Sequence, residues 1–434
     1  MPPRAAECLA QAAEALDGGS PQIALDALAD LLADAEAPPD TGLLGRALPL
    51  AARAYESLGF AGLAQGARAV ADDPTDVNRL YALAHALLEK PALAFAKAFA
   101  AGLLARAHLL APEREPILTE LVAALEMEGR FSTARTRLAQ SALDSFLIRY
   151  LKAFTTLMGG ELAGFRHLAA RLDPGSDAER TMVSGLTEMI ARADAVAGAT
   201  PLDPDDLRGW HYVLTGGLLL HLAPRAAALG GRYGDLEDSE ALCLEGIQRL
   251  GAVLDAWGMR IPRILMFPNP ESRRLGLAVA GLLGVSAREA ILPDAEGLFV
   301  VYDLENLLPE VRQAFRDRAP GKLLFAHAAR WTAEQDLVAD FTTLLYERIV
   351  SPWNRHAIYP RRPNLPTGPP TESDAQLAAR IATAVLPATA LEDLPALLAL
   401  ANAAGEGASA RRSEGTRSRL WIGRPVRNGR AIAP

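Results

Sequence analysis

The stretch Gly297-Leu-Phe-Val-Val-Tyr-Asp303 decides how the second half of this chain folds. It is a continuous run of apolar, partly β-branched residues, and such runs are typical of strands that a parallel sheet buries on both faces. Similar runs lie at residues 263–267 and 322–327, and helix-like segments at residues 271–283 and 307–318 separate the three. This strand–helix–strand order predicts a mostly parallel, three-layer, Rossmann-like α/β domain with right-handed crossovers.

Further segments complete the predicted α/β domain. Two apolar runs on either side of Gly216-Gly217 predict a β-hairpin over residues 210–222, because glycine adopts the positive φ of a tight turn. Residues 232–238 are polar and predict a loop, and a helix is expected at about residues 239–257. Residues 332–353 are expected to close the domain with one helix.

Two histidines flank this predicted hairpin. His211 and His221 would approach one another across the strand ladder, which raises the question of a metal site. Two histidines without a nearby cysteine or acidic ligand make a weak site, so ordinary half-buried side chains are the expectation.

Before about residue 205 the sequence pattern differs and predicts short helices rich in alanine and leucine. Small residues at Ala61, Ala64 and Ala67 allow paired helices to pack closely, and turn residues follow most of the helical segments. The chain is therefore expected to be mainly α. The expected helices span residues 44–58, 60–71, 100–110, 117–128, 132–143, 153–159, 161–172 and 177–196.

Two segments of this helical half share a pattern. One is Tyr55-Glu56-Ser57-Leu58-Gly59-Phe60, with Ala64, Ala67 and Pro74 after it, and the other is Glu128-Gly129-Arg130-Phe131 with Ala134. Through them residues 20–175 resemble the tetratricopeptide (TPR) family. That resemblance implies stacked helix pairs and a groove that holds a peptide or a partner helix. A strict period of about 34 residues is missing, so a divergent TPR-like solenoid is expected, with an irregular helical bundle as the alternative.

Polar residues follow the predicted strands of the α/β domain at the edge where open sheets bind ligands. Free N–H groups at a helix start, helped by an arginine, would receive an anion, and carboxylates would hold sugar hydroxyls or a metal. The structural alternative is that these residues cap helices or pack at the sheet edge. The candidate ligand-binding residues are Asn269, Ser272, Arg273, Asp303, Glu305 and His327.

The order of elements over residues 240–330 has a distant resemblance to type I phosphoribosyltransferases. In this resemblance Gly297–Asp303 stands for the strand before the acidic pair, with Asp303 in place of one acidic residue. It implies a phosphoribosyl reaction, but residues 304–309 contain neither glycine nor threonine to cradle a phosphate. A degenerate, non-catalytic copy is therefore the expectation.

Length, charge and cysteine content argue against several classes of protein. The chain has 434 residues, a formal net charge of −8 and two cysteines. The negative charge argues against nucleic acid as the main partner, and two cysteines without a CxxC motif indicate a reducing cytoplasm and no disulfide framework. No secretory signal, membrane span, cofactor or metal site is predicted. The last 30 residues, 405–434, are rich in Gly, Ser and Arg and are expected to be a disordered tail.

The sequence therefore predicts four regions: a TPR-like helical domain (1–200), an α/β domain with an N-terminal β-hairpin (205–357), a Pro-rich linker with helices (358–404), and the Arg-rich tail (405–434). The leading hypothesis is a cytoplasmic interaction protein, scaffold or regulatory adaptor, whose solenoid groove binds a protein partner. In the alternative, the α/β domain is an enzyme acting on a phosphorylated or nucleotide-like small molecule. Nucleic-acid binding through the tail is a third hypothesis.

Overall fold

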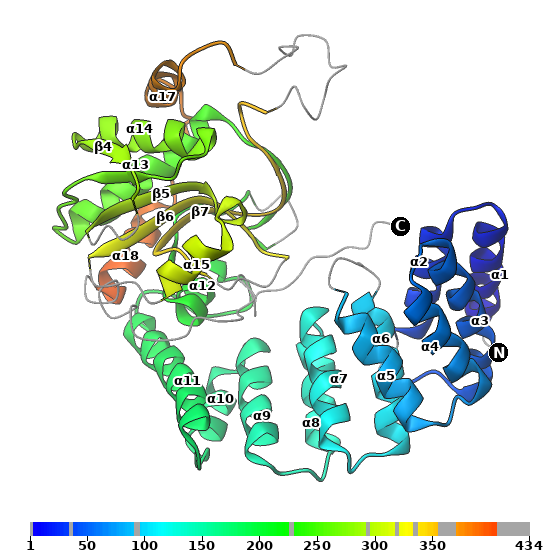
Figure 1. The fold of residues 1–434 in the computed structure, drawn as a ribbon. Coiled ribbons are helices and arrows are strands. Elements are labelled where there is room, and N and C mark those ends of the chain that lie inside the picture. The colour runs from blue at the N-terminus through cyan, green and yellow to red at the C-terminus, as the bar shows by residue number, and fades with distance from the viewer. Residues whose placement is uncertain are drawn as a thin grey trace. The chain divides into compact units, whose positions relative to one another are not determined.

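The protein is represented by a computed structural model that describes residues 3–33, 38–90, 96–224, 230–291, 296–316, 321–332, 337–354 and 370–405. The chain divides into two compact units, Met1–Arg180 and Thr181–Pro434. The described part of the first unit contains helices alone, whereas the second combines helices with a sheet (Figure 1). The prediction of a mainly α chain with an α/β region after a helical region is therefore confirmed. Within the described residues, no helix is both long enough and apolar enough to cross a membrane.

The first unit is a succession of helix pairs. Helices next to one another in the chain pack together, and α1, α5 and α7 also contact α3, α7 and α9, respectively. Alanine and leucine form most of its core, in which Tyr55 and Phe99 meet edge to face with ring centroids 6.4 Å apart. The helices are α1 (Pro3–Asp17), α2 (Pro21–Leu32), α3 (Thr41–Ser57), α4 (Ala61–Asp72), α5 (Val77–Leu88), α6 (Ala96–Leu110), α7 (Glu115–Met127), α8 (Phe131–Gln140), α9 (Phe146–Met158) and α10 (Leu162–Ala169).

One turn recurs between the paired helices. After α3, Gly59 has φ +81°, and the N–H of Phe60 donates to the carbonyl of Tyr55 at 2.8 Å. These features define a Schellman helix end, which needs a left-handed residue that glycine supplies without strain. In the same turn the N–H of Gly59 donates to the carbonyl of Glu56 at 3.0 Å. Both hydrogen bonds and a positive φ recur at three other glycines of this unit, which join α1 to α2, α7 to α8 and α9 to α10: Gly19, Gly129 and Gly160. The first unit is therefore built from recurring helix–turn–helix units.

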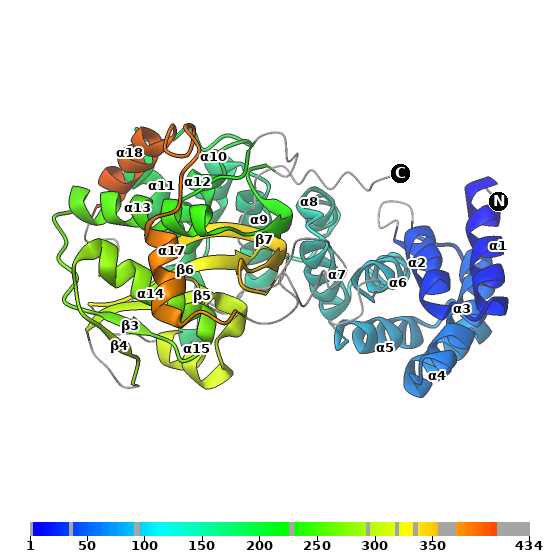
Figure 2. The ribbon, with the colours of Figure 1, turned by 90° about the horizontal axis from the view of Figure 1, so that it is seen from above.

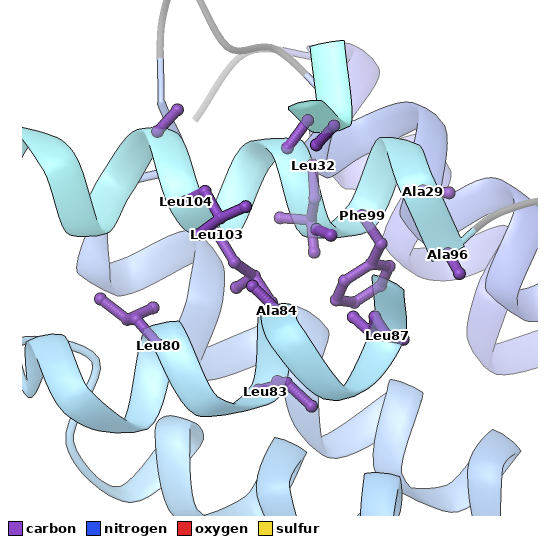
Figure 3. Close-up of a cluster of buried hydrophobic side chains, with 14 of the residues drawn as sticks. Ala29, Leu32, Leu80, Leu83, Ala84, Leu87, Ala96, Phe99, Leu103 and Leu104 are labelled. Atoms are coloured by element: carbon purple, nitrogen blue, oxygen red, sulfur yellow. The ribbon is translucent and has the colours of Figure 1, made fainter. Parts of the chain in front are cut away.

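Stacking in this unit departs from a simple nearest-neighbour order, because α2 contacts α6 directly. A Cβ added at Gly102 of α6 would lie 1.7 Å from the carbonyl oxygen of Leu32, so α6 passes closely against the end of α2. Figure 3 shows Leu32 pointing toward Phe99 and Leu103 of α6. The guanidinium of Arg130 donates to the carbonyl of Ala33 at 2.5 Å and satisfies the same helix end.

The second unit contains a seven-stranded sheet whose strand pairs are all parallel, which confirms the predicted mostly parallel sheet. Its order is β1-β7-β6-β5-β3-β4, and β2 also pairs with β7, beyond the segment that β1 covers. The strands are β1 (Leu218–Leu219), β2 (Tyr233–Glu237), β3 (Ile264–Met266), β4 (Ala287–Glu289), β5 (Gly297–Asp303), β6 (Lys322–Arg330) and β7 (Phe341–Val350).

Helices cover both faces of this sheet, with α13 and α14 on one side of the strands and α15 on the other (Figure 1). On the first side Trp257 at the end of α13 packs on Phe341, and on the second Phe315 of α15 packs on Phe299. Figure 2 shows α17 beside α14 and α18 beside α13. The helices are α11 (Asp177–Val196), α12 (Leu207–Thr215), α13 (Glu240–Ala256), α14 (Pro270–Leu283), the 3-10 helix η2 (Leu304–Asn306), α15 (Pro309–Arg316), α17 (Asp374–Ala382) and α18 (Leu394–Ala404).

The predicted β-hairpin is wrong. Residues 207–215 form α12, capped by Asp206, whose carboxylate accepts a hydrogen bond from the N–H of Gly209 at 2.9 Å. Gly216 has φ +70° as the left-handed residue that ends this helix, rather than as part of a hairpin turn. All nine residues of α12 are buried, including Arg208, His211 and Thr215, which share one face of the helix. His211 in α12 and His221 after β1 therefore do not face each other across a ladder.

Two further predictions in this unit are wrong. The helix expected over residues 332–353 is replaced by β7, whose first residues are β-branched or aromatic and lie between β6 and β1. The polar loop expected over residues 232–238 contains β2, which pairs with the last residues of β7. The predicted linker between residues 358 and 369 and the Arg-rich tail beyond Gly405 lie outside the described residues.

Candidate functional site

The predicted anion-binding residues at the start of α14 make intramolecular contacts. The carboxamide of Asn269 accepts a hydrogen bond from the N–H of Ser272 at 2.8 Å and caps the helix. The hydroxyl oxygen of Ser272, which is completely buried, accepts from the N–H of Tyr302 at 2.9 Å. These bonds tie the first turn of α14 to β5, as the structural alternative supposed.

Arg273 lies at the same helix start but interacts with neighbouring carboxylates. Its guanidinium is 2.6 Å from Glu289 at the end of β4 and 3.6 Å from Asp374 at the start of α17. The hydrogen bond to Glu289 raises the pKa of Arg273 further, so the side chain is a permanent cation. A ligand anion would have to compete with both carboxylates for it.

Asp303 and Glu305 lie beyond the carboxyl end of β5. The carboxylate of Asp303 accepts hydrogen bonds from the N–H of Glu305 at 3.0 Å and from the hydroxyl of Tyr346 at 2.7 Å. Burial raises the pKa of Asp303 to about 6, although the bond from Tyr346 opposes this rise. Glu305 pairs with Arg312 of α15 at 3.6 Å.

His327 belongs to a different cluster, because strand alternation places it and Tyr302 on the face opposite to Asp303. Its Nε2 lies 3.0 Å from Oδ2 of Asp238 and 3.7 Å from Sγ of Cys243, and Sγ is 3.6 Å from the same Oδ2. The hydroxyl of Tyr302 donates to this Oδ2 at 2.6 Å. We call Asp238, Cys243, Tyr302 and His327 the α13–β6 cluster.

Local structure explains how these four side chains meet. Asp238 directly precedes Ser239, the N-cap of α13, and its Oδ1 accepts from the N–H of Ser239 at 2.7 Å. Cys243 follows one turn into α13, while Tyr302 and His327 lie side by side on the adjacent strands β5 and β6. All four are at most 2% exposed. Burial is the main cause that raises the pKa values of Cys243 and Tyr302 well above normal, and the nearby carboxylate of Asp238 raises them further. Both side chains are therefore protonated.

A second polar network lies farther along α13. The carboxylate of Glu245 contacts His221 and Arg249, both at 2.8 Å. Arg249 and Arg208 each lie 2.6 Å from Asp393, next to the start of α18. Burial alone would raise the pKa of Glu245, but His221 and Arg249 outweigh it and hold that pKa below normal. This network ties α12 and α18 to α13.

The structure does not bring the sequence candidates into one site. Ser272 bonds to the backbone of Tyr302 in the α13–β6 cluster, and His327 lies in that cluster with residues that the sequence analysis did not select. Asp303 lies on the opposite face of the sheet, and Arg273 pairs with other carboxylates. The missed partners Asp238 and Cys243 are 89 and 84 residues from His327 in the chain, so no local motif marks them. The position of Asp238 immediately before a helix cap, and of Cys243 one turn later, is the sole local signal.

Within the described residues, one group of histidine, cysteine and acidic side chains has the spacing of metal ligands: Asp238, Cys243 and His327. Comparison with known proteins supplies no assignment for it, because no family model, curated protein or solved structure matches this chain.

Proposed function

We propose that this protein is an interaction or regulatory adaptor acting in the cytoplasm, whose helical unit binds a protein partner and whose α/β unit is a ligand-sensing or structural module. In this proposal the helical unit is a divergent TPR-like solenoid. The observation that carries it is the recurrence of one Schellman turn between four helix pairs, at Gly19, Gly59, Gly129 and Gly160. Recurring helix pairs stack because each leaves an apolar face that a neighbour must bury, and such stacks present extended binding surfaces.

Helices α5 and α7 present a suitable surface, formed by Asn78, Tyr81, His85, Arg114 and Glu120 (the α5–α7 surface). The carboxylate of Glu120 accepts from the hydroxyl of Tyr81 at 2.6 Å and lies 3.0 Å from His85. The rings of Tyr81 and His85 stack 6.0 Å apart, and Arg114 donates to Asn78 at 2.8 Å. Half of the His85 side chain is exposed, so an aromatic and hydrogen-bonding surface is accessible to a partner peptide.

The test uses full-length protein as bait in native lysate, with the fragment 1–200 in parallel. A partner should be retained by both baits and lost when His85→Ala and Glu120→Lys are combined. Glu56→Lys is the matched control, since it reverses a half-exposed glutamate of α3 that pairs with Arg68, away from the α5–α7 surface. Each variant should unfold within a few degrees of the unmodified protein. Equal recovery of the partner by all variants would show that this surface does not bind it.

An enzyme acting on a phosphorylated or nucleotide-like molecule is the second candidate. It is favoured by the position of α14, whose N-terminus follows the carboxyl end of β3. The discriminating measurement is thermal unfolding with nucleotides and with phosphoribosyl pyrophosphate, each with and without Mg²⁺. A ligand of the folded state raises the midpoint by mass action. For this candidate, Arg273→Ala should abolish the rise, whereas the control Arg348→Ala, at an exposed ion pair with Asp235, should not.

A further inference from the structure

The α13–β6 cluster has the composition and spacing of a metal site. We propose that Asp238, Cys243 and His327 bind one divalent transition-metal ion, for which their mixed oxygen, sulfur and nitrogen ligands favour zinc. This site is independent of the proposed protein-binding function and of the predicted anion site at α14.

The distances between the ligand atoms agree with tetrahedral zinc. With bonds of about 2.3 Å to sulfur and about 2.0–2.1 Å to nitrogen or oxygen, a tetrahedron separates sulfur from either lighter ligand by about 3.6 Å. The observed separations from Sγ of Cys243 are 3.6 Å to Asp238 and 3.7 Å to His327. Nitrogen and oxygen should be about 3.3 Å apart, and Nε2 and Oδ2 are 3.0 Å apart. Small side-chain shifts therefore suffice to admit the ion.

Hydrogen bonding alone explains this arrangement poorly. The hydroxyl of Tyr302, the thiol of Cys243 and the imidazole of His327 all converge on the single oxygen Oδ2 of Asp238. One thiol proton serves either Asp238 or His327 and not both, whereas a metal ion satisfies sulfur, nitrogen and oxygen together. Nε2 is the ring atom of His327 that lies near the other two ligands, and a neutral ring bound through Nε2 carries its proton on Nδ1.

Charge provides a separate argument. Asp238, Cys243 and His327 are completely buried, where a divalent ion needs anionic ligands to offset the loss of its hydration. Binding replaces the thiol proton by the metal ion and releases one proton, so the +2 ion balances one carboxylate and one thiolate. The N–H of Ser239 and the hydroxyl of Tyr302 already hold the carboxylate of Asp238, as outer hydrogen bonds do around metal ligands. A bound ion would fasten the start of α13 to β6.

The experiment measures the metal content of full-length protein purified after growth with added zinc, and of protein unfolded and refolded with Co²⁺. We expect about one zinc per chain and, with Co²⁺, the charge-transfer absorption of a cobalt–thiolate bond. The chain has two cysteines, so Cys8→Ser is a matched control that must keep both signals, because Cys8 lies in α1 of the other unit. Cys243→Ser should lose the thiolate band, and His327→Gln should lower metal affinity at least tenfold.

Two outcomes would overturn the proposal. If folded Cys8→Ser protein carries neither zinc nor a cobalt–thiolate band, the cluster is a buried hydrogen-bonded group without a metal. If Cys243→Ser folds and keeps one zinc per chain, the ion is held elsewhere. Should Cys243→Ser fail to fold, the spectrum of Cys8→Ser still decides the matter, since Cys243 is then the one thiol present.

Discussion

The hydroxyl oxygen of Ser272 accepts a hydrogen bond from the backbone N–H of Tyr302 across 2.9 Å, with both residues buried. This bond links the first turn of α14 to the end of β5, directly before η2 begins. A residue that sequence rules place in an anion site is thus a structural link between helix and sheet.

Ser272→Ala should destabilise the second unit, because it leaves the buried N–H of Tyr302 without an acceptor. The expected loss is about 1–3 kcal/mol of unfolding free energy in urea titrations. Ser57→Ala is the control, since the exposed hydroxyl of Ser57 donates to the carbonyl of Arg53 in its own helix, and its effect should be under about 0.5 kcal/mol. Equal losses in the two variants would contradict a specific role for Ser272.

Gly102→Ala should disrupt the contact between α2 and α6. The added methyl group would lie 1.7 Å from the carbonyl oxygen of Leu32, so the helices must separate, at a cost of about 1–3 kcal/mol or more. Gly45→Ala in α3 meets no neighbouring atom and should instead stabilise the unit by about 0.5–1 kcal/mol through helix propensity. Chemical denaturation of fragment 1–200 measures both, and a neutral Gly102→Ala would show that the helices do not approach this closely.

Asp303 should impose an identifiable pH dependence on stability. Its pKa is raised to about 6 in the folded protein, against about 4 in an unfolded chain, so the folded state binds the extra proton between these values. The contribution of Asp303 to the unfolding free energy is therefore fully present below about pH 4. It is lost as the pH rises through about 6, and the loss is on the order of 2–3 kcal/mol. The difference in unfolding free energy between the unmodified protein and Asp303→Asn, measured from pH 4 to 7, should follow this curve. A flat difference would mean that Asp303 titrates normally.

Asp393→Ala should leave Arg208 and Arg249 buried without their shared counterion. Removing one partner of a buried ion pair costs about 3–5 kcal/mol of unfolding free energy. We expect about 3 kcal/mol here, because the side chain of Asp393 is 37% exposed. Asp235→Ala removes an ion pair with Arg348 whose side chains are about three-quarters exposed, and its cost should stay below about 1 kcal/mol. Thermal and urea unfolding distinguish the two, and similar small effects would indicate that water reaches both arginines.

Sequence patterns predicted well those elements whose signals are local. Gly297–Asp303 and Asp177–Val196 have the predicted bounds, because one is a continuous apolar run and the other an amphipathic helix with acidic residues at its start. The glycines after α3 and α7 likewise marked helix ends. The sequence predicts a strand in place of α12 because this segment is short, rich in aromatic and aliphatic residues, and followed by Gly216-Gly217, which also suits a hairpin turn.

Long-range pairing limited the rest. Residues 341–350 begin with the β-branched and aromatic residues of a strand, but no local pattern indicates that β7 pairs with β1, β2 and β6. The position of His327 at the end of an apolar run marks it as a candidate site residue. Its contacts with Asp238 and Cys243 depend on how α13 packs on the sheet, which the sequence does not show. Chemistry of this kind becomes visible when the fold is known.

The late position of β7 affects how the protein can be made. Leu218 of β1 pairs with Phe341 of β7, so β1 waits for more than a hundred further residues to be synthesised before its partner exists. Until then the edge of β6 and the backbone groups of β1 and β2 remain unpaired, and exposed strand edges invite association with other chains. The helical unit, whose contacts are mostly between neighbours, can fold while the ribosome is still working. The second unit therefore keeps unpaired strand edges until β7 has been synthesised, and its buried arginines Arg208 and Arg249 wait longer still for Asp393.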